Sequence, residues 1–399
     1  MTTNSTILSA DIIIDDITNC IDAFSNDEQL HNPSYETGLT GFALYYLYLS
    51  KYKNDESYII KAEDYINRAI ASLDLKNFKR VYDTDSLDAQ LSHIGRFLLF
   101  CNKHSLLDTE SSDYLKQLDS VLFDLMKSKI TIKDFDSTSG ALASGFYFLS
   151  RAESGVPQDE KISYLINSID TFSMKDKDGD YFWESPSLYD RVYLGISHGS
   201  ALIISYLTNV YKCNIEKELC LKIIDKAVNF LLKQYRKSKY KGLFPNMIGD
   251  KIEPMQFALC YGDIGLGFAL LKASKILSST KIEIFSNMIL NDCLLRTKED
   301  NLTLDAGIFY GASGLGIAFD QLSLVSSDKN FSERANYWYE QIPKYAIHEN
   351  QFAGFQSRLS ENDILWNVSY GWGILGIGIS LMCHKNRALP SLAELTFIK

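Results

Sequence analysis

The sequence predicts an all-α protein built from repeated helical hairpins. Three observations support this fold class: only 7 of the 399 residues are prolines, apolar side chains recur at helical spacing, and a glycine-rich turn that opens into an apolar helix returns along the chain. The alternation of apolar and polar residues that marks strands is not sustained anywhere, and no strand–helix–strand pattern occurs. Hairpins repeated in this way form either an open solenoid or a closed toroid.

Two segments illustrate the helical spacing. Thr6 to Phe24 carries an apolar stripe formed by Ile13, Ile17, Ile21 and Phe24. Ile215 to Lys233 carries another, formed by Leu219, Ile223, Ile224, Val228 and Leu231. Side chains three or four positions apart share one face of a helix, so each segment is predicted to be one amphipathic helix. The segment from Lys175 to Tyr193 is rich in Asp and aromatic residues and is predicted to be a long ordered loop.

The repeated turn has two glycines that flank two or three other residues. Its clear copies begin at Gly38, Gly195, Gly262, Gly311 and Gly373. Two weaker copies are Gly140 to Ala143, where alanine replaces the second glycine, and Gln90 to His93, where both glycines are absent. Successive copies lie 49 to 67 residues apart, which leaves room for two helices and two connections in each interval.

We therefore expect about seven helical hairpins in a single domain that covers residues 1–399. Glycine permits positive φ and a close approach of the chain at each helix start. In a toroid, the inner helices would bring their N-terminal ends together on one face. Those ends carry free N–H groups and partial positive charge, so this face is the expected place for a functional site.

Composition and charge exclude several classes of protein. Hydrophobic residues make up 46% of the chain and charged residues 23%, which is typical of a folded globular protein. The chain has 40 Lys and Arg against 50 Asp and Glu, and this net charge of −10 disfavours a partner such as nucleic acid or anionic lipid. No run reaches the ~18 apolar residues of a membrane span. The first residues lack the features of a signal peptide, so a cytoplasmic protein is expected.

The cysteines and histidines follow no standard metal-binding pattern. Seven cysteines are scattered without a CxxC pair, so neither a disulfide framework nor a zinc ribbon is expected. Cys383 and His384 are adjacent, but they follow the last apolar helix instead of opening one. We therefore do not expect them to be a metal pair.

Four residues near the repeated turns are candidates for chemistry. His198 lies inside the turn from Gly195 to Gly199, where it could exchange protons near neutral pH or only satisfy a backbone carbonyl. Cys260 precedes Gly262 near a helix start, which favours a thiolate, although a small buried apolar role is the alternative. Two further candidates are Tyr261, which could form a hydrogen bond, and Asp136. Asp136 could cap a helix, or it could orient or exchange protons with a partner such as His198.

The motifs around these residues together resemble those of the lanthionine synthetase C-like family, the cyclases of lanthipeptide biosynthesis. The motifs are Phe-Asp-Ser-Thr-Ser-Gly140, Gly195-Ile-Ser-His-Gly199, Cys260-Tyr-Gly and Gly311-Ala-Ser-Gly. Their order and separation are similar to the family's blocks, and the resemblance covers nearly the whole chain. It implies an α/α toroid with two concentric helix layers.

The resemblance also implies an activity. Family cyclases act on a dehydrated precursor peptide and add a cysteine thiol to dehydroalanine or dehydrobutyrine, which forms a thioether ring. A zinc ion held by two cysteines and one histidine activates the thiol as thiolate. By position, Cys260 resembles the first zinc cysteine, Asp136 and His198 resemble the acid/base pair, and Tyr261 lies beside the first ligand.

The sequence departs from the family at the other two zinc ligands. Phe309 and Tyr310 stand where the family has Cys-His, and Gln256 replaces the arginine before the zinc cysteine. Phenylalanine cannot coordinate a metal, tyrosine is a rare zinc ligand, and Cys260 alone cannot hold zinc tightly. We therefore expect no cofactor, because a family-type zinc site is predicted to be absent or weak.

Three functions remain open at this stage. The first is a zinc-independent cyclase in which Asp136, His198 and Tyr261 carry out the proton transfers. The second is a non-catalytic scaffold that binds a precursor peptide or a lanthipeptide dehydratase. The third is other chemistry found on α/α toroids, such as glycoside hydrolysis, for which Asp136, Asp263 and Glu184 are the candidate carboxylates.

Overall fold

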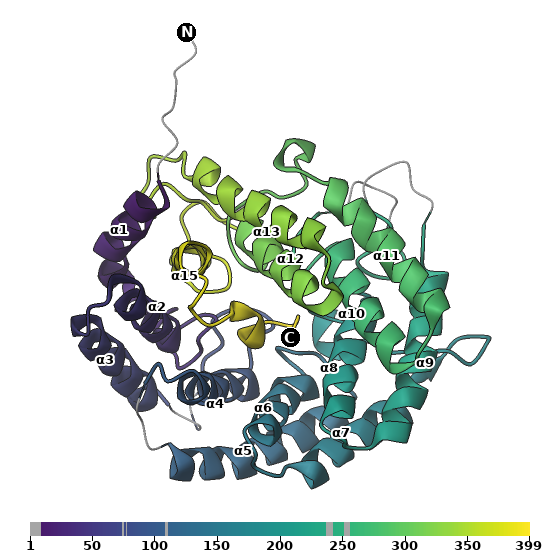
Figure 1. Cartoon of the computed structure of the whole chain (residues 1–399). Helices are drawn as coiled ribbons and strands as arrows, with labels where there is room; N and C mark the ends of the chain where they lie inside the picture. Colours follow the sequence, from purple (N-terminus) through teal and green to yellow (C-terminus); the bar gives the residue numbers. More distant parts are fainter. Residues whose placement is uncertain (1–8, 74–75, 77, 108–110, 237–241, 251–255) are drawn as a thin grey trace. The chain divides into compact units, whose positions relative to one another are not determined.

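A computed structural model of the chain describes residues 9–73, 76, 78–107, 111–236, 242–250 and 256–399. The chain forms two compact units. The first unit consists of residues 1–74 and 298–392, and the second consists of residues 75–297 and 393–399. Each unit is built from paired helices (Figure 1). Among the described residues, the only strands are β1 (Met174–Lys175) and β2 (Tyr181–Phe182), which form a short antiparallel hairpin.

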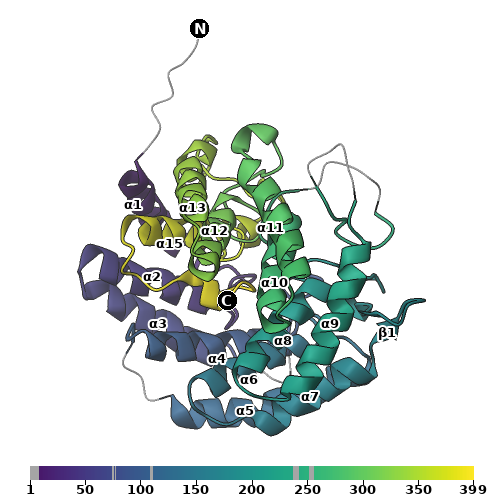
Figure 2. The ribbon, with the colours of Figure 1, turned by 45° about the vertical axis from the view of Figure 1, so that its right-hand side comes forward.

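The second unit contains four helix pairs in sequence order. They are α4 (Leu87–Lys103) with α5 (Ser112–Thr131), α6 (Ala141–Glu153) with α7 (Asp159–Thr171), α8 (Ser200–Lys212) with α9 (Lys217–Lys233), and α10 (Asp263–Ile276) with α11 (Thr280–Leu295). The first helices of the pairs contact one another in the order α4, α6, α8, α10 and lie side by side (Figure 2). They form an inner layer, and their partners form an outer layer.

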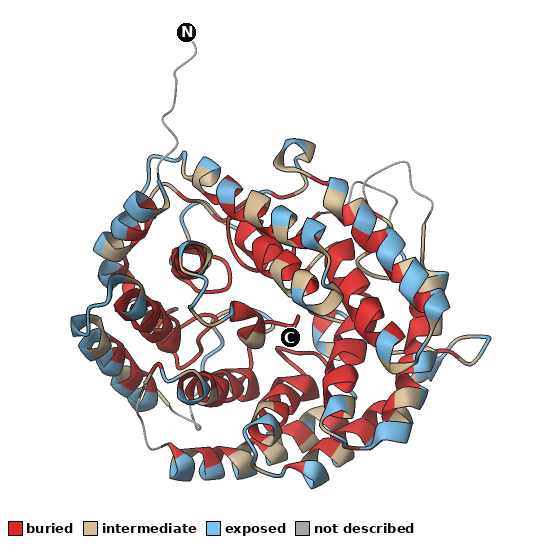
Figure 3. Cartoon of the chain, viewed as in Figure 1, coloured by how far each residue is buried: buried red, intermediate tan, exposed pale blue. Residues whose placement is uncertain are grey.

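The inner and outer helices differ in how much of their surface is buried. The inner helices α8 and α10 are buried over most of their length, whereas outer helices such as α9 bury one apolar stripe and expose the opposite face (Figure 3). The inner helices are apolar on all sides because both the outer layer and the neighbouring inner helices cover them. This explains why the sequence shows long apolar runs directly after the glycine turns.

The first unit contains the remaining pairs. They are α2 (Leu39–Lys53) with α3 (Ser57–Ala71), and α12 (Ala312–Ser326) with α13 (Lys329–Gln341). Between α2 and α12 lies α15 (Ile374–Lys385), which contacts both and also packs against α1 (Ala10–Cys20). The described residues thus form seven helix pairs. In the seventh, the two helices are far apart in the sequence, which the regular spacing of the turns did not predict.

The glycine turns begin the inner helices as predicted, with one exception. The backbone before α8 turns at Gly199, whose φ is 154°, and a Cβ atom there would lie 2.2 Å from the carbonyl oxygen of Tyr193. Only glycine fits such a position. The weakest copy was placed wrongly: α4 begins after Ser86, whose Oγ accepts a hydrogen bond from the backbone of Ala89, so Gln90 to His93 lie inside the helix. Here serine replaces glycine as the cap.

The predicted helices and loop agree with the structure apart from their ends. The predicted helix from Thr6 is observed as α1, continued by a 3₁₀ turn over Ile21–Phe24, while its first residues lie outside the described part. The helix predicted from Ile215 is observed as α9. The predicted loop before Tyr193 contains β2 and a 3₁₀ turn over Pro186–Leu188. No helix in the described ranges is long and apolar enough to cross a membrane.

Candidate active site

The second unit brings Asp136 and His198 into direct contact. Asp136 lies in the loop before α6, and His198 lies in the turn before α8, so both precede the N-terminal ends of neighbouring inner helices. His198 Nδ1 lies 2.7 Å from Asp136 Oδ2. The Asp136 side chain is fully buried, and 15% of the His198 side chain is exposed. Asp136 is therefore inaccessible from outside the protein, while part of the His198 side chain is accessible.

Asp136 is held as an ionised carboxylate. Its Oδ1 accepts hydrogen bonds from the backbone N–H and hydroxyl of Thr138, each at 2.8 Å, and from the same two groups of Ser139, each at 3.2 Å. Burial alone would raise the pKa of Asp136, but the charge and hydrogen bond of His198 and the Thr138 donors outweigh it and lower the pKa to about 2. Both carboxylate oxygens of Asp136 thus have hydrogen-bond partners, and this geometry is suited to orienting the His198 ring.

This carboxylate fixes the tautomer of His198. Because ionised Asp136 can only accept, His198 Nδ1 must carry the proton that lies between them. Nε2 is then the nitrogen of the neutral ring that has a lone pair, and it is the atom that can take up or release a proton. Two tyrosine rings lie near the His198 ring, with centroid distances of 6.0 Å to Tyr193 and 6.3 Å to Tyr261. The arrangement thus provides one candidate acid/base group with two phenols nearby.

Hydrogen bonds from side chains to the main chain join three of the inner-helix turns. Ser137 Oγ donates to the carbonyl of Ser197 at 2.8 Å, and Ser197 Oγ donates to the carbonyl of Cys260 at 3.2 Å. These bonds connect the loops before α6, α8 and α10. The positions of Asp136, His198 and Cys260 are thus set by a common framework.

Sequence reasoning missed three members of this site: Ser137, Ser197 and Tyr193. The two serines act through bonds to main-chain carbonyls, for which no sequence pattern exists. Tyr193 had no sequence signal either, because the close approach of its carbonyl to Gly199 is visible only in the structure.

The residues at the family's zinc-ligand positions do not fit a zinc ion. Cys260 is buried, with 5% of its surface exposed. In the first unit, the Phe309 ring packs edge-on against Trp372 at 5.0 Å, and the Arg358 guanidinium lies 5.5 Å from the centre of the Tyr310 ring. Phe309 and Tyr310 thus contact their neighbours through the faces and edges of their rings. Within the described ranges, no three His, Cys, Asp or Glu side chains lie close enough together to hold a metal ion.

The other candidates have structural partners. Asp263 is fully buried, forms an ion pair with Arg296, and accepts the backbone N–H of Phe244 at 3.1 Å. Cys383 donates to the carbonyl of Pro390 at 3.6 Å, and His384 stacks on a tyrosine ring at 4.9 Å. Among the three candidate carboxylates, Asp136 is therefore paired with His198, Asp263 is paired with Arg296, and Glu184 is exposed.

Comparison with known proteins defines the class to which this fold and site belong. The chain belongs to the lanthionine synthetase C-like family, whose model, described as "Lanthionine synthetase C-like protein", matches residues 3–393. It is a family of lanthipeptide cyclases, whose substrate is a precursor peptide.

Among solved structures, nisin cyclase is similar to this chain, with a TM-score of 0.72 and 18% sequence identity over 94% of each chain. At this identity the likeness establishes the fold, which is an α/α toroid. The fold class predicted from the sequence is confirmed.

Proposed function

We propose that this chain is a thioether-forming cyclase that acts on a dehydrated precursor peptide without a bound zinc ion. The observation that carries the proposal is the 2.7 Å contact between His198 and a buried, ionised Asp136 at the N-terminal ends of the inner helices. A protein that kept the fold only for binding would not need a buried carboxylate that fixes a histidine tautomer. Family membership supplies the reaction class, and this pair supplies the group that moves protons.

In the proposed reaction, His198 Nε2 removes the proton from a peptide cysteine thiol. The thiolate attacks the β-carbon of a dehydroalanine or dehydrobutyrine, so that an S–C bond forms as the C=C π bond breaks. The electron pair moves to the α-carbon and its carbonyl as an enolate. The imidazolium then returns its proton to the α-carbon, and no oxidant or reductant is needed. General acid/base catalysis of this kind contributes about 10²- to 10⁴-fold in rate.

Asp136 and Tyr261 have supporting roles in this proposal. The positive charge that forms on His198 after it takes the thiol proton is stabilised by Asp136, because a fully buried anion 2.7 Å away interacts strongly with it. The Tyr261 ring flanks His198, and its hydroxyl is proposed to hydrogen-bond the enolate oxygen. A free thiol has a pKa of about 8.5, so a nearby base is needed for a substantial thiolate fraction at neutral pH.

The proposal places this protein after a dehydratase. Dehydroalanine and dehydrobutyrine arise when water is lost from serine and threonine, so an enzyme of that class must act on the peptide first. Whether it also binds this chain physically is a separate question that co-purification answers.

The experiment that tests the proposal measures ring formation on a dehydrated, cysteine-containing peptide. Ring closure leaves the peptide mass unchanged, so remaining thiols are counted by mass spectrometry after alkylation. The native chain should close rings faster than the uncatalysed reaction, and His198→Ala should lose about 10²-fold or more of that rate. Peptide affinity, measured separately, should persist. If His198→Ala and the native chain close rings equally fast, or neither exceeds the uncatalysed rate, the chain acts as a scaffold instead.

A further inference from the structure

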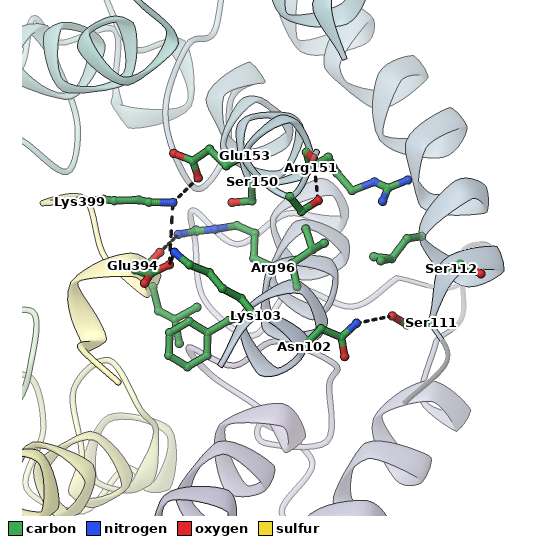
Figure 4. A pocket seen from close by; sticks show the side chains of 15 residues that line it. Arg96, Asn102, Lys103, Ser111, Ser112, Ser150, Arg151, Glu153, Glu394 and Lys399 are labelled. Carbon is green, nitrogen blue, oxygen red and sulfur yellow. Dashed lines mark hydrogen bonds and ion pairs between the residues drawn. The ribbon is translucent and has the colours of Figure 1, made fainter. Parts of the chain in front are cut away.

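The second unit has a cavity of about 690 Å³ at the end of its inner helices opposite to His198 (Figure 4). Its walls come from the last turns of α4 and α6, the first turn of α5, and the segment 393–399. Three of its cationic side chains form ion pairs, namely Arg151 with Asp119, Lys399 with Glu153, and Lys103 with Glu394. α6 has 13 residues, so the cavity lies about 20 Å from the acid/base pair. The groups that act on this pair must therefore come from the loops at its own end.

One of these loops is the long segment 172–199, which joins α7 to α8 and contains the turn with His198. The segment is attached to both of the outer helices beside it. The indole N–H of Trp183 donates to the carbonyl of Ile169 in α7 at 3.0 Å. The Phe182 ring stacks on the Phe230 ring of α9, with a centroid distance of 4.9 Å. These contacts fix the position from which the rest of the segment runs toward the acid/base pair.

The middle of this segment forms a tight loop. The backbone N–H of Ser185 donates to the carbonyl of Arg191 at 2.9 Å, and a 3₁₀ turn covers Pro186–Leu188 between them. Tyr189 and Asp190 follow with φ values of 63° and 52°, in the left-handed region that residues other than glycine rarely adopt. Such a backbone persists only where the surrounding contacts enforce it, so the position of the 3₁₀ turn is closely specified.

This turn brings Ser187 against the loop that holds Asp136. Ser187 Oγ forms a hydrogen bond with Ser139 Oγ, and Ser139 Oγ donates to Asp136 Oδ1 at 3.2 Å. The other carboxylate oxygen, Asp136 Oδ2, lies 2.7 Å from His198 Nδ1. Four side chains thus form a continuous chain of hydrogen bonds from the segment 172–199 to the acid/base pair. Ser187 is exposed, whereas Ser139 and Asp136 are buried, so Ser187 is the end of the chain that faces solvent.

Ser187 also acts on Asp134, a second residue that holds Asp136. Asp134 Oδ1 accepts the backbone N–H of Asp136 at 3.0 Å. Burial raises the pKa of the Asp134 carboxyl, and a hydrogen bond with Ser187 opposes this effect by lowering the pKa. A hydroxyl can donate one hydrogen bond while it accepts another. Ser187 therefore connects the two residues that fix Asp136, one through its backbone and the other through its carboxylate.

We propose that Ser187 is a positioning residue for ring formation, which keeps the Asp136 carboxylate aligned with His198. It acts through Ser139 and Asp134 and not on the peptide. The inference rests on the proposed function for the reaction, whereas the chain of hydrogen bonds does not depend on it. The segment 172–199 thus serves the acid/base pair as well as joining two helices.

Ring-closure kinetics of matched serine variants test this role. Ser187→Ala should lower kcat about threefold to tenfold, the effect of one hydrogen bond, and leave KM unchanged. Ser187→Thr keeps the hydroxyl and should close rings at the native rate. The control is Ser173→Ala, which removes a hydroxyl of the same segment that donates to the carbonyl of Asp170 at 2.7 Å, and it should also be native. Because Ser187 is exposed, Ser187→Ala is expected to fold.

Three kinetic results would overturn the inference. The first is a native rate in Ser187→Ala. The second is an equal loss of rate in Ser187→Thr, which would show that the hydroxyl is not the cause. The third is a rise in KM with kcat unchanged, which would assign Ser187 to peptide binding instead of positioning.

The ring-nitrogen signals of His198 in ¹H–¹⁵N NMR spectra separate this inference from the proposed function. They report the tautomer and the hydrogen bond to Asp136 without any peptide, at a mildly alkaline pH where free histidine is neutral. Ser187→Ala should change these signals and add those of the second tautomer, whereas Ser173→Ala should not. If the signals change but the native chain closes no rings, the positioning role stands and the cyclase proposal fails. If rings form and Ser187→Ala has native signals and native rates, the cyclase stands and the inference is wrong.

Discussion

Asp136→Asn is the most informative single substitution at the site. The asparagine side chain has the same shape, and its amide oxygen can still accept the Thr138 and Ser139 donors. Its NH₂ group then faces His198 Nδ1, where the carboxylate had accepted. Because two donors cannot share that hydrogen bond, the histidine must place its proton on Nε2. The nitrogen that faces the substrate then cannot take up a proton.

The effect of Asp136→Asn on the unfolding free energy follows from the environment of the carboxylate. Its pKa is lowered from 3.8 to about 2, which corresponds to roughly 2 kcal/mol in favour of the ionised form in the folded state. A carboxyl with a folded pKa below its unfolded value stabilises the fold above pH 3.8 and loses this contribution as the pH falls through 2. Asp136→Asn should therefore lower the unfolding free energy at neutral pH by about 2 kcal/mol. The difference from the native chain should shrink between about pH 4 and pH 2.

The assay combines ring-closure kinetics with chemical denaturation. We expect the rate of ring closure to fall by about 10²-fold or more in Asp136→Asn, at a temperature where the variant remains folded. Ser139→Ala is the control, because it removes one hydroxyl donor from Asp136 and leaves the contact with His198 in place. A rate for Asp136→Asn within a few-fold of the control would refute the argument that this carboxylate sets the histidine tautomer.

Three further outcomes are expected. Gly199→Ala should lower the unfolding free energy by about 2–4 kcal/mol in urea denaturation, because φ is 154° and the new Cβ would strike a carbonyl oxygen. The control is Gly155→Ala, which also has a positive φ but no atom within 4 Å of the new Cβ. It should lower the unfolding free energy by only about 1 kcal/mol. Arg296→Met should lower the unfolding free energy by about 3–5 kcal/mol in the same measurement, since it leaves the fully buried Asp263 carboxylate without its main cation. A decrease below about 1 kcal/mol would show that the ion pair is not maintained in solution. Cys260→Ala should close rings at nearly the native rate, and a loss comparable to that of His198→Ala would assign the thiol a role in the reaction.

The repeated turns were predictable because the physical requirement is local. A helix start that passes within van der Waals distance of a carbonyl needs glycine, so the pattern is visible in the sequence at Gly199 and Gly262. Where a serine cap meets the same need, as at Ser86, the glycine signal disappears and the predicted turn was placed four residues too late. The pairing of α1 with α15 also lay beyond the reach of the pattern, because it depends on packing between distant parts of the chain.

The candidate site was predictable in part for a similar reason. Asp136 and His198 were recognisable because each lies at a fixed position relative to a turn, and the structure places them in hydrogen-bond contact. The sequence could not separate an orienting role of Asp136 from proton exchange. The orienting role that we propose depends on the Thr138 and Ser139 donors to one carboxylate oxygen, which only the structure shows. The contact of Ser187 with Ser139 had no sequence signal, since the two residues lie in different segments that only the fold brings together.

The central claim is that ring formation here relies on His198 and Asp136 and not on a zinc ion. The most direct test measures ring closure by the native chain after dialysis against a strong zinc chelator, with residual zinc determined by elemental analysis. We expect substoichiometric zinc and a rate of ring closure equal to that of the untreated protein. Loss of the rate on chelation, with recovery when zinc is added back, would contradict it and would show that other residues complete a zinc site around Cys260.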